Sequence, residues 1–263
     1  MKTEYKDAPL WLAIPISIVS WVATAIFAVF FVLLDLIVLL PLSALIDKGT
    51  RNLIHWGAIG WAKGIIAFTP VWKADVDGLQ NIEKGKSYLI VCNHQSMLDI
   101  LVLAARLPLL FKFLAKKELF SIPFVGWHMS LAKYIAVDRE SVGSRHKALL
   151  DLSSWLKKGA SVLFFPEGTR SPDGQIRAFK PAAFKAARDA GVDILPVVID
   201  GTGDALPKHS LWLKKHARFQ LSILPSVSMK DVSNEKIETI QEQIRQMMMT
   251  QLHQIRSQAP GAE

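Results

Sequence analysis

The residues from Ala8 to Leu34 carry no formal charge, and any fold for this chain has to place these 27 consecutive residues. As a helix they would be about 40 Å long, which exceeds the roughly 30 Å hydrocarbon core of a bilayer. The run is longer than the apolar part of a cleavable signal peptide, about 7–15 residues, and it leads into further apolar sequence. We therefore interpret it as a membrane anchor, with a long buried core helix as the alternative.

A second apolar stretch, residues 53–68, follows a polar break at residues 47–51. Two apolar helices joined by a short polar turn predict a helical hairpin that either spans the membrane or dips into one leaflet. Asp35 interrupts the apolar sequence, so we expect its side chain at a membrane interface or facing the partner helix. The chain thus divides into a predicted membrane-anchoring hairpin over residues 1–70 and a globular domain over residues 71–263.

Composition and charge exclude several classes of protein. Hydrophobic residues make up 51% of the chain and the mean hydropathy is +0.26, which excludes a disordered protein. The single cysteine, Cys92, excludes a disulfide scaffold and a structural zinc finger. Residues 1–69 carry a net charge of +1 and residues 70–263 carry +7, so anionic lipid or anionic substrates are expected partners. Nucleic acid is not expected, because the sequence has no Lys/Arg-rich recognition helix and no aromatic RNA-binding pattern.

From residue 72 onward, short apolar runs alternate with segments of helical periodicity. This alternation predicts an α/β domain with a mixed, largely parallel sheet flanked by helices. The predicted strands are residues 87–91, 134–137, 161–165, 194–199 and 218–224, with weaker candidates at 72–76 and 111–114. The predicted helices are residues 96–107, 144–158, 180–190 and 232–256.

Polar residues follow several of these strands, where functional groups collect in open α/β sheets. His94 leaves the strand at 87–91 and Asp99 enters the next helix, so a turn between them brings a carboxylate onto the imidazole. Such a pair fixes the ring tautomer and leaves the other nitrogen as a general base for a hydroxyl group. The alternative is structural: a histidine that caps the helix and an aspartate in its first turn.

Three further strand ends carry charged residues. The turn after the strand at 161–165 contains four candidate residues, Glu167, Gly168, Thr169 and Arg170. Its glycine permits a tight turn and its arginine suits a phosphate, although a turn with a surface salt bridge is the alternative. Arg139 follows the strand at 134–137, where a solvated charge pair is the alternative. Lys116 follows the candidate strand at 111–114, where an exposed helix start is the alternative.

Five segments with these residues occur in one order: Asn93-His94 with Asp99, Ala115–Leu119, Val137–Arg139, Phe165–Ser171 and Leu195–Ile199. In this order and spacing they closely resemble the 1-acyl-sn-glycerol-3-phosphate acyltransferase family, roughly over residues 75–225. A membrane-bound N-terminal helical motif is also usual in that family. Two positions depart from the family pattern, Lys133 and Ala182, where members often have glycine.

The resemblance implies a role for each matching residue. His94 is implied as the general base that deprotonates the acceptor hydroxyl, and Asp99 as its orienting partner. The acceptor-binding turn is implied to consist of Glu167, Gly168, Thr169 and Arg170, with Arg170 on the phosphate. Lys116 and Arg139 are similar to basic residues that help to hold that phosphate.

The implied activity is transfer of a fatty acyl group from acyl-CoA or acyl carrier protein to the sn-2 hydroxyl of lysophosphatidic acid. The product is phosphatidic acid, a phospholipid precursor. No cofactor or metal is expected, because the thioester is already activated. The expected location is the bacterial inner membrane, with the catalytic domain on the cytoplasmic side and against anionic membrane lipid.

Several alternatives stay open at this point. In the first alternative, the protein acylates another lysolipid or an amino-lipid. The second is a membrane-anchored metal-dependent hydrolase, and the third is a lipid-binding module without catalysis. Within the acyl-transfer chemistry, backbone N–H groups after Asn93 are candidates for oxyanion stabilisation. A covalent acyl-enzyme would require Cys92 or Ser96, of which Cys92 is better interpreted as a core residue.

Overall fold

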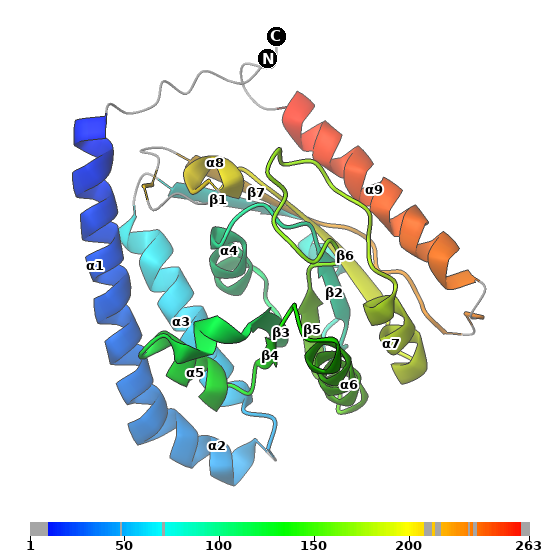
Figure 1. Cartoon of the computed structure of the whole chain (residues 1–263), viewed down its shortest axis with the longest axis horizontal. Helices are drawn as coiled ribbons and strands as arrows, with labels where there is room; N and C mark the ends of the chain where they lie inside the picture. The colour runs from blue at the N-terminus through cyan, green and yellow to red at the C-terminus, as the bar shows by residue number, and fades with distance from the viewer. Residues whose placement is uncertain are drawn as a thin grey trace.

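The computed structural model describes residues 10–47, 49–69, 72–207, 212–213, 217–230, 232–233 and 236–258. It contains a seven-stranded sheet in the order β1-β7-β6-β2-β5-β3-β4 (Figure 1). The strands are β1 (Trp72–Asp77), β2 (Leu89–Cys92), β3 (Phe111–Lys116), β4 (Ile135–Val137), β5 (Ser161–Phe164), β6 (Ile194–Asp200) and β7 (Ala217–Ile223). Both weaker strand candidates, at 72–76 and 111–114, are strands.

The five strands β6, β2, β5, β3 and β4 run parallel to one another, whereas β7 is antiparallel to β6 and β1 is parallel to β7. The prediction of a mixed, largely parallel sheet is therefore confirmed. Because these five strands share one direction, their carboxyl ends all reach the same edge of the sheet. Every strand end that the sequence singled out lies along this edge.

Helices cover both faces of the sheet. One face carries α3 (Asn52–Phe68), α4 (Leu98–Arg106) and α5 (Val125–Leu131), and the other carries α6 (Val142–Lys157), α7 (Ala182–Ala190) and α9 (Ile237–Ser257). The fully buried strand β2 alternates between the two cores: Leu89 and Val91 pack toward α6, α7 and α9, while Ile90 and Cys92 pack toward α3 and α4. The short elements are η2 (Leu79–Asn81), η3 (Lys117–Ser121) and α8 (Thr202–Ala205).

The predicted N-terminal hairpin is present. Its first arm is one continuous helical segment made of α1 (Leu10–Leu34), a π-helical turn η1 (Asp35–Leu39) and α2 (Leu40–Ile46), and its second arm is α3. Within the first arm, an 18-residue stretch of residues 17–46 has a mean hydropathy of 2.8, and only 17% of that stretch is buried. Among the described residues this is the one helix long and apolar enough to cross a membrane.

Glycines of α3 form notches that receive side chains of the first arm. A Cβ atom at Gly60 would lie 2.8 Å from Cε1 of Phe31, and a Cβ atom at Gly57 would lie 2.7 Å from Oδ1 of Asp35. Small residues allow this close approach of two helices. Asp35 is fully buried and its carboxylate also pairs with Nδ1 of His128 in α5, so it faces the partner helix, one of the two placements expected.

The second arm of the hairpin is also part of the domain core. Ile54, Ala62 and Ile65 of α3 belong to the same buried cluster as residues of β2, β6 and β7. Helix α5 had no counterpart among the predicted elements, because a seven-residue helix is too short to show a clear helical period of apolar residues. The helix predicted at 232–256 is observed as α9; residues 231, 234 and 235 lie outside the described residues.

Candidate active site

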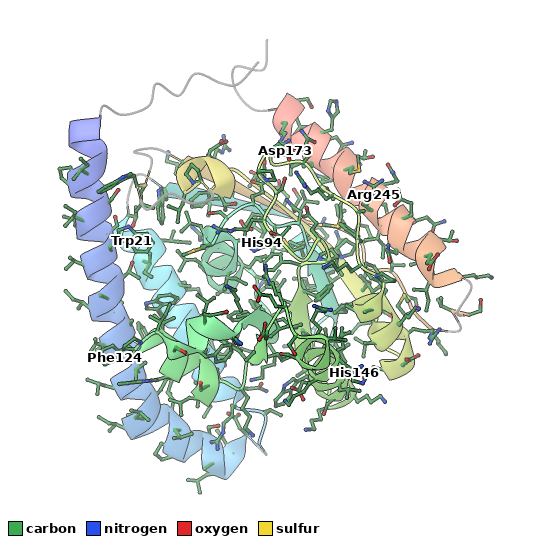
Figure 2. All side chains as sticks on the ribbon, in the orientation of Figure 1. Trp21, His94, Phe124, His146, Asp173 and Arg245 are labelled. Carbon is green, nitrogen blue, oxygen red and sulfur yellow. The ribbon has the colours of Figure 1, made fainter. Side chains whose placement is uncertain are left out.

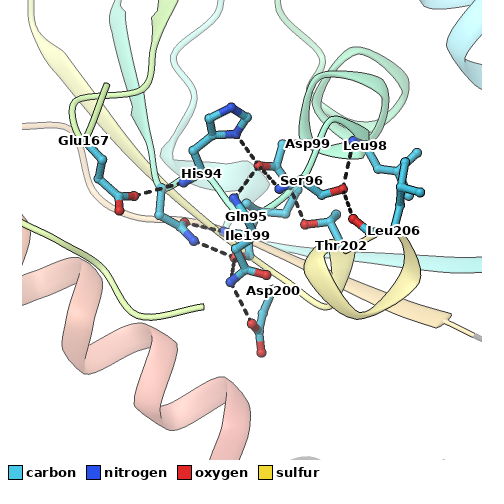
Figure 3. A network of polar contacts seen from close by, with 11 residues as sticks. His94, Gln95, Ser96, Leu98, Asp99, Glu167, Ile199, Asp200, Thr202 and Leu206 are labelled. Atoms are coloured by element: carbon cyan, nitrogen blue, oxygen red, sulfur yellow. Dashed lines mark hydrogen bonds and ion pairs between the residues drawn. The ribbon is translucent and has the colours of Figure 1, made fainter. Parts of the chain in front are cut away.

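His94 and Asp99 form a hydrogen-bonded pair at the carboxyl end of β2. His94 lies two residues beyond the strand and Asp99 lies in the first turn of α4. Nδ1 of His94 is 2.7 Å from Oδ2 of Asp99 (Figure 3). Asp99 is fully buried, whereas the His94 side chain is 12% exposed. The pair therefore has an inner member shielded from water and an outer member that a substrate can reach.

The Asp99 carboxylate is held by several donors at once. Oδ2 accepts hydrogen bonds from the backbone N–H of Gln95, at 2.7 Å, and of Ser96, at 3.0 Å. Oδ1 accepts a hydrogen bond from the hydroxyl of Thr202. An ionised carboxylate only accepts, so Nδ1 of His94 donates to it and Nε2 keeps a free lone pair. The imidazole is thus set up to accept a proton at Nε2.

The turn after β5 holds the backbone and the ring of His94. The N–H of His94 donates to Oε1 of Glu167 at 3.0 Å, and its carbonyl accepts a hydrogen bond from the N–H of Ser171 at 2.7 Å. The ring stacks on Phe165 with centroids 4.0 Å apart. Burial raises the pKa of the Glu167 carboxyl. The backbone N–H groups of His94 and Arg177 oppose this shift, because they donate hydrogen bonds to its two oxygens. Glu167 therefore binds the main chain of the site.

Gly168 adopts a φ of +74°, a conformation that side chains other than glycine rarely adopt. A Cβ atom here would lie 2.7 Å from Nζ of Lys180, which places that ammonium group against the turn. Thr169 is exposed and Arg170 is half-buried. Arg170 makes no hydrogen bond or ion pair with any residue that the structure describes, so its guanidinium group is available to a ligand.

The two remaining basic candidates lie on neighbouring strand ends. Lys116 ends β3 and forms an exposed ion pair with Glu118 at 3.3 Å, and Arg139 follows β4 and is exposed. The parallel arrangement puts both on the same sheet edge as His94, but neither contacts His94. The structure thus brings His94, Asp99 and Glu167 into direct contact and leaves the three candidate cations at the rim.

Two contacts of this site could not be recognised from the sequence, those of Thr202 and Asn93. Thr202 lies 103 positions after Asp99, and only the return of the chain through β6 brings its hydroxyl to the carboxylate. The side chain of Asn93 bonds to both the carbonyl and the N–H of Ile199, at 2.8 and 2.9 Å, and so ties β2 to β6. Asn93 was part of the motif, but its structural role depends on the strand order.

The geometry disfavours a covalent acyl-enzyme. Cys92 is fully buried in β2, and burial raises the pKa of its thiol well above the usual value. Ser96 is also fully buried, and its hydroxyl donates to the carbonyl of Leu206 at 2.8 Å. Neither side chain is a free nucleophile at the surface of the site.

The first backbone N–H groups after Asn93 are already engaged. Those of Gln95 and Ser96 bind Asp99, and that of His94 binds Glu167. The hypothesis that they stabilise an oxyanion is therefore wrong for these three groups. Among the described residues, no three or more His, Cys, Asp or Glu side chains are grouped closely enough to hold a metal ion.

Comparison with known proteins identifies the family. An acyltransferase family model matches residues 73–200. A chloroplastic 1-acyl-sn-glycerol-3-phosphate acyltransferase of Arabidopsis thaliana is 38% identical over 184 residues, which are 70% of this chain and 51% of the relative. The alpha form of this enzyme in Mus musculus is 30% identical over 190 residues, 72% of this chain and 67% of the relative. The chain thus spans about half the length of the plant relative and two thirds of the mouse one.

A solved structure shares the fold. The crystal structure of the 1-acyl-sn-glycerophosphate acyltransferase PlsC from Thermotoga maritima superposes with a TM-score of 0.70 at 23% identity, covering 92% of this chain and 99% of that one. With the order of the motifs and the observed sheet, these similarities establish that the chain belongs to the 1-acyl-sn-glycerol-3-phosphate acyltransferase family.

Proposed function

We propose that this protein transfers a fatty acyl group from acyl-CoA or acyl carrier protein to the sn-2 hydroxyl of 1-acyl-glycerol-3-phosphate. The observation that carries the proposal is the His94–Asp99 pair, whose free Nε2 lies on a sheet edge rimmed by cations. A base next to positive charge suits an acceptor that carries both a hydroxyl and a phosphate. The relatives in Arabidopsis thaliana and Mus musculus are named for this acceptor, which supports the proposal.

In the proposed mechanism Nε2 of His94 takes the proton of the acceptor hydroxyl as its oxygen attacks the thioester carbonyl. Asp99 stabilises the imidazolium that forms. The tetrahedral intermediate collapses, its C–S bond breaks, and the departing thiolate takes the proton back from the imidazolium. The products are the ester and the free thiol, so His94 is restored in each cycle.

We assign phosphate binding to Arg170, assisted by Lys116 and Arg139. Arg170 is half-buried and without a protein partner in the described part of the chain, and a guanidinium group can bind phosphate with two parallel hydrogen bonds. Lys116 and Arg139 are more exposed and add positive charge at the rim. Glu167, Gly168 and Thr169 complete the acceptor-binding turn, with Glu167 supporting it through the backbone of His94 and Arg177.

We further propose that the hairpin lies in one membrane leaflet. The globular domain contacts the first arm of the hairpin at two widely spaced points: the N–H of Leu213 donates to Oγ of Ser17 at 2.8 Å, and His128 pairs with Asp35. Eighteen residues separate these two contacts, about 27 Å of helix, so a crossing helix would pull the domain into the hydrocarbon. With soluble acyl donors on the same side, the domain would face the cytoplasm at a bacterial inner membrane.

The proposal is tested with the purified protein in vesicles, each candidate donor and a set of acceptors, with phosphatidic acid measured by mass spectrometry. Lysophosphatidic acid should be acylated by the wild type and by His146→Ala, which changes an exposed histidine of α6 (Figure 2), but not by folded His94→Ala. Arg170→Ala should raise the KM for lysophosphatidic acid and leave the donor KM unchanged.

The alternatives predict different results in the same assay. Acylation of another lysolipid or an amino-lipid alone would refute the acceptor assignment. Hydrolysis that a chelator abolishes, without consumption of thioester, would indicate the metal-dependent hydrolase. Full activity of His94→Ala would overturn the assigned base.

A further inference from the structure

The C-terminal helix α9 ends in a contact with the candidate active site. In its last turn, Nη2 and Nε of Arg256 donate to the two carboxylate oxygens of Asp200, at 2.9 and 3.1 Å. Nη2 also donates to the carbonyl of Gly174 at 2.9 Å. The side chains of Arg256 and Asp200 are 33% and 19% exposed, so this bidentate pair is largely shielded from water.

One arm of this contact leads to the His94–Asp99 pair. Asp200 is the last residue of β6, and its Oδ1 also accepts a hydrogen bond from Nε2 of Gln95 at 2.9 Å (Figure 3). Gln95 follows His94 in the chain, and its backbone N–H binds Asp99 at 2.7 Å. Arg256 therefore holds, through Asp200, the side chain of the residue whose main chain orients the catalytic carboxylate.

The other arm leads to the loop that follows Arg170. Gly174 has a φ of +71°, and a Cβ atom there would lie 2.8 Å from Nη2 of Arg256, so the loop passes directly against the guanidinium group. The same loop begins with Ser171, whose N–H binds the carbonyl of His94 at 2.7 Å. Figure 2 shows Asp173 of this loop beside the C-terminal end of α9.

The pairing has a clear electrostatic cause. The carboxylate of Asp200 raises the pKa of Arg256, which keeps the guanidinium group charged under all ordinary conditions. Without Arg256, Asp200 would keep only the neutral amide of Gln95 as a side-chain partner among the described residues, and Gly174 would lose its donor. A partly buried carboxylate without its cation is costly, so the two segments are expected to rearrange.

We propose that Arg256 is a positioning residue for acyl transfer. It fastens the His94–Gln95 segment to the loop at residues 171–179, and it comes from a helix beyond the residues 73–200 that match the acyltransferase family model. This inference rests on the proposed function for its kinetic consequence. Its structural consequence, a tethered loop, does not depend on the substrate.

The experiment compares Arg256→Gln with Arg256→Lys and with a matched control, Arg245→Gln. Arg245 lies in the same helix, and its partners among the described residues, Glu242 and Met249, both belong to that helix. Arg256→Gln should lower kcat and raise the acceptor KM, together about tenfold or more in kcat/KM, with the donor KM unchanged. Arg256→Lys keeps the charge, so its kcat/KM should fall less than that of Arg256→Gln. Arg245→Gln should have the kcat/KM of the wild type.

A second measurement separates this inference from the proposed function. Hydrogen exchange of the amides at residues 94–96 and 171–178 should be faster in Arg256→Gln and unchanged in Arg245→Gln, whatever the acceptor is. Failure of the wild type to acylate lysophosphatidic acid would refute the proposed function but not this result. Unchanged exchange in Arg256→Gln, or an equal loss of activity in Arg245→Gln, would overturn the inference. If Arg256→Gln does not fold, Arg256→Lys takes its place in both measurements. Unchanged exchange in Arg256→Lys, or an equal loss of activity in Arg245→Gln, would then overturn the inference.

Discussion

At the scale of single residues, His94 is held at its polar atoms by different segments of the chain. Its N–H binds Glu167, its carbonyl binds Ser171, and its Nδ1 binds Asp99. No hydrogen-bond partner for Nε2 occurs among the described residues. The position of Nε2, the proposed base, is therefore determined by contacts at the other polar atoms of His94.

We expect Asp99→Asn to lower kcat about 10³–10⁴-fold, the loss typical of a histidine base whose orienting carboxylate becomes an amide. The amide would present its NH₂ group to Nδ1 or to the N–H groups of Gln95 and Ser96, so the ring tautomer would no longer be fixed. Steady-state kinetics measure the effect, with circular dichroism to verify the fold.

Thr202→Val is the control for this prediction, because it removes one hydrogen bond to Asp99 and keeps the His94–Asp99 pair. It should cost far less activity than Asp99→Asn. Equal losses in the two variants would mean that Asp99 acts in packing and not in orienting the base.

A buried lysine predicts a pH dependence of stability. Lys112 in β3 is 2% exposed; its Nζ donates to the carbonyl of Ala132 at 2.8 Å and lies 5.2 Å from the centre of the Trp155 ring. Burial lowers the pKa of Lys112 from 10.5 to about 8. Between these values the unfolded chain binds more protons than the folded one, so stability rises with pH.

Relative to Lys112→Met, the wild type should therefore gain up to about 3 kcal/mol in unfolding free energy as the pH rises from 8 to 10.5. Urea unfolding in detergent across this range measures the difference, and the methionine variant cancels the contributions of all other titrating groups. A constant difference between the two proteins would show that Lys112 titrates alike in the folded and unfolded chains.

At the scale of elements, the first arm of the hairpin and α3 fit together through glycine. Gly57, Gly60 and Gly64 present no side chains, and Asp35, Phe31 and Phe27 of the first arm occupy the space. The spacing of the three glycines places them on one side of α3. Helix-to-helix distance in the hairpin is therefore set by the absence of Cβ atoms.

Gly60→Leu should destabilise the protein by about 1–3 kcal/mol, because the new side chain overlaps the ring of Phe31. Ala67→Leu, an exposed position on the same helix, adds similar volume without that overlap. Thermal unfolding of both variants in detergent tests this prediction. Similar melting temperatures for the two would mean that the hairpin is not packed as described.

The departure at Lys133 has a backbone explanation. Its φ of +55° lies in the left-handed region, where glycine is preferred, so the glycine usual in this family serves the turn between α5 and β4. Nζ of Lys133 donates to the carbonyl of Gly49 in the turn of the hairpin at 3.0 Å. This position therefore bears on the fold of the turn.

At the scale of the whole molecule, three layers and an outer hairpin arm give the protein two different sides. The first arm lies along the side of the domain that carries α3 and α5 (Figure 1). It exposes large apolar side chains over most of its length, including Val19, Ile26, Phe30, Ile37 and Leu45. On the opposite side, the exposed residues of α6, α7 and α9 are mostly polar, and the large apolar exceptions are Val142, Leu150, Met247 and Met249.

The one-leaflet arrangement predicts the depth of these side chains in a bilayer. Val19→Cys and Ile37→Cys, at positions 67% and 72% exposed, can be labelled with a fluorophore because the native Cys92 is fully buried. In vesicles both labels should be quenched by lipids that carry a shallow quencher, to a similar extent. A crossing helix would separate the two labels by about 27 Å and give quite different depths, which would contradict the arrangement.

The sequence alone determined the class of the fold and the centre of the site. Helix and strand periods are local properties, so the alternation after residue 72 was enough to predict a largely parallel sheet. The two apolar stretches joined by the polar break at residues 47–51 were enough to predict the hairpin. The spacing of His94 and Asp99 crosses a single turn, so their contact was also predictable. Charged residues after parallel strands had to meet at one edge, because that edge collects all the strand ends.

The tertiary structure decided what depends on contacts between distant segments. Three hydrogen-bonded contacts join residues that lie 56–103 positions apart in the chain: Thr202 with Asp99, the backbone of His94 with Glu167, and Arg256 with Asp200. Such contacts follow from strand order, register and packing, which no local period encodes. The same reason explains α3: its apolar sequence suits lipid or a protein core equally well, and only the packing against α4 and the rest of the buried cluster placed Ile54, Ala62 and Ile65 in the domain core.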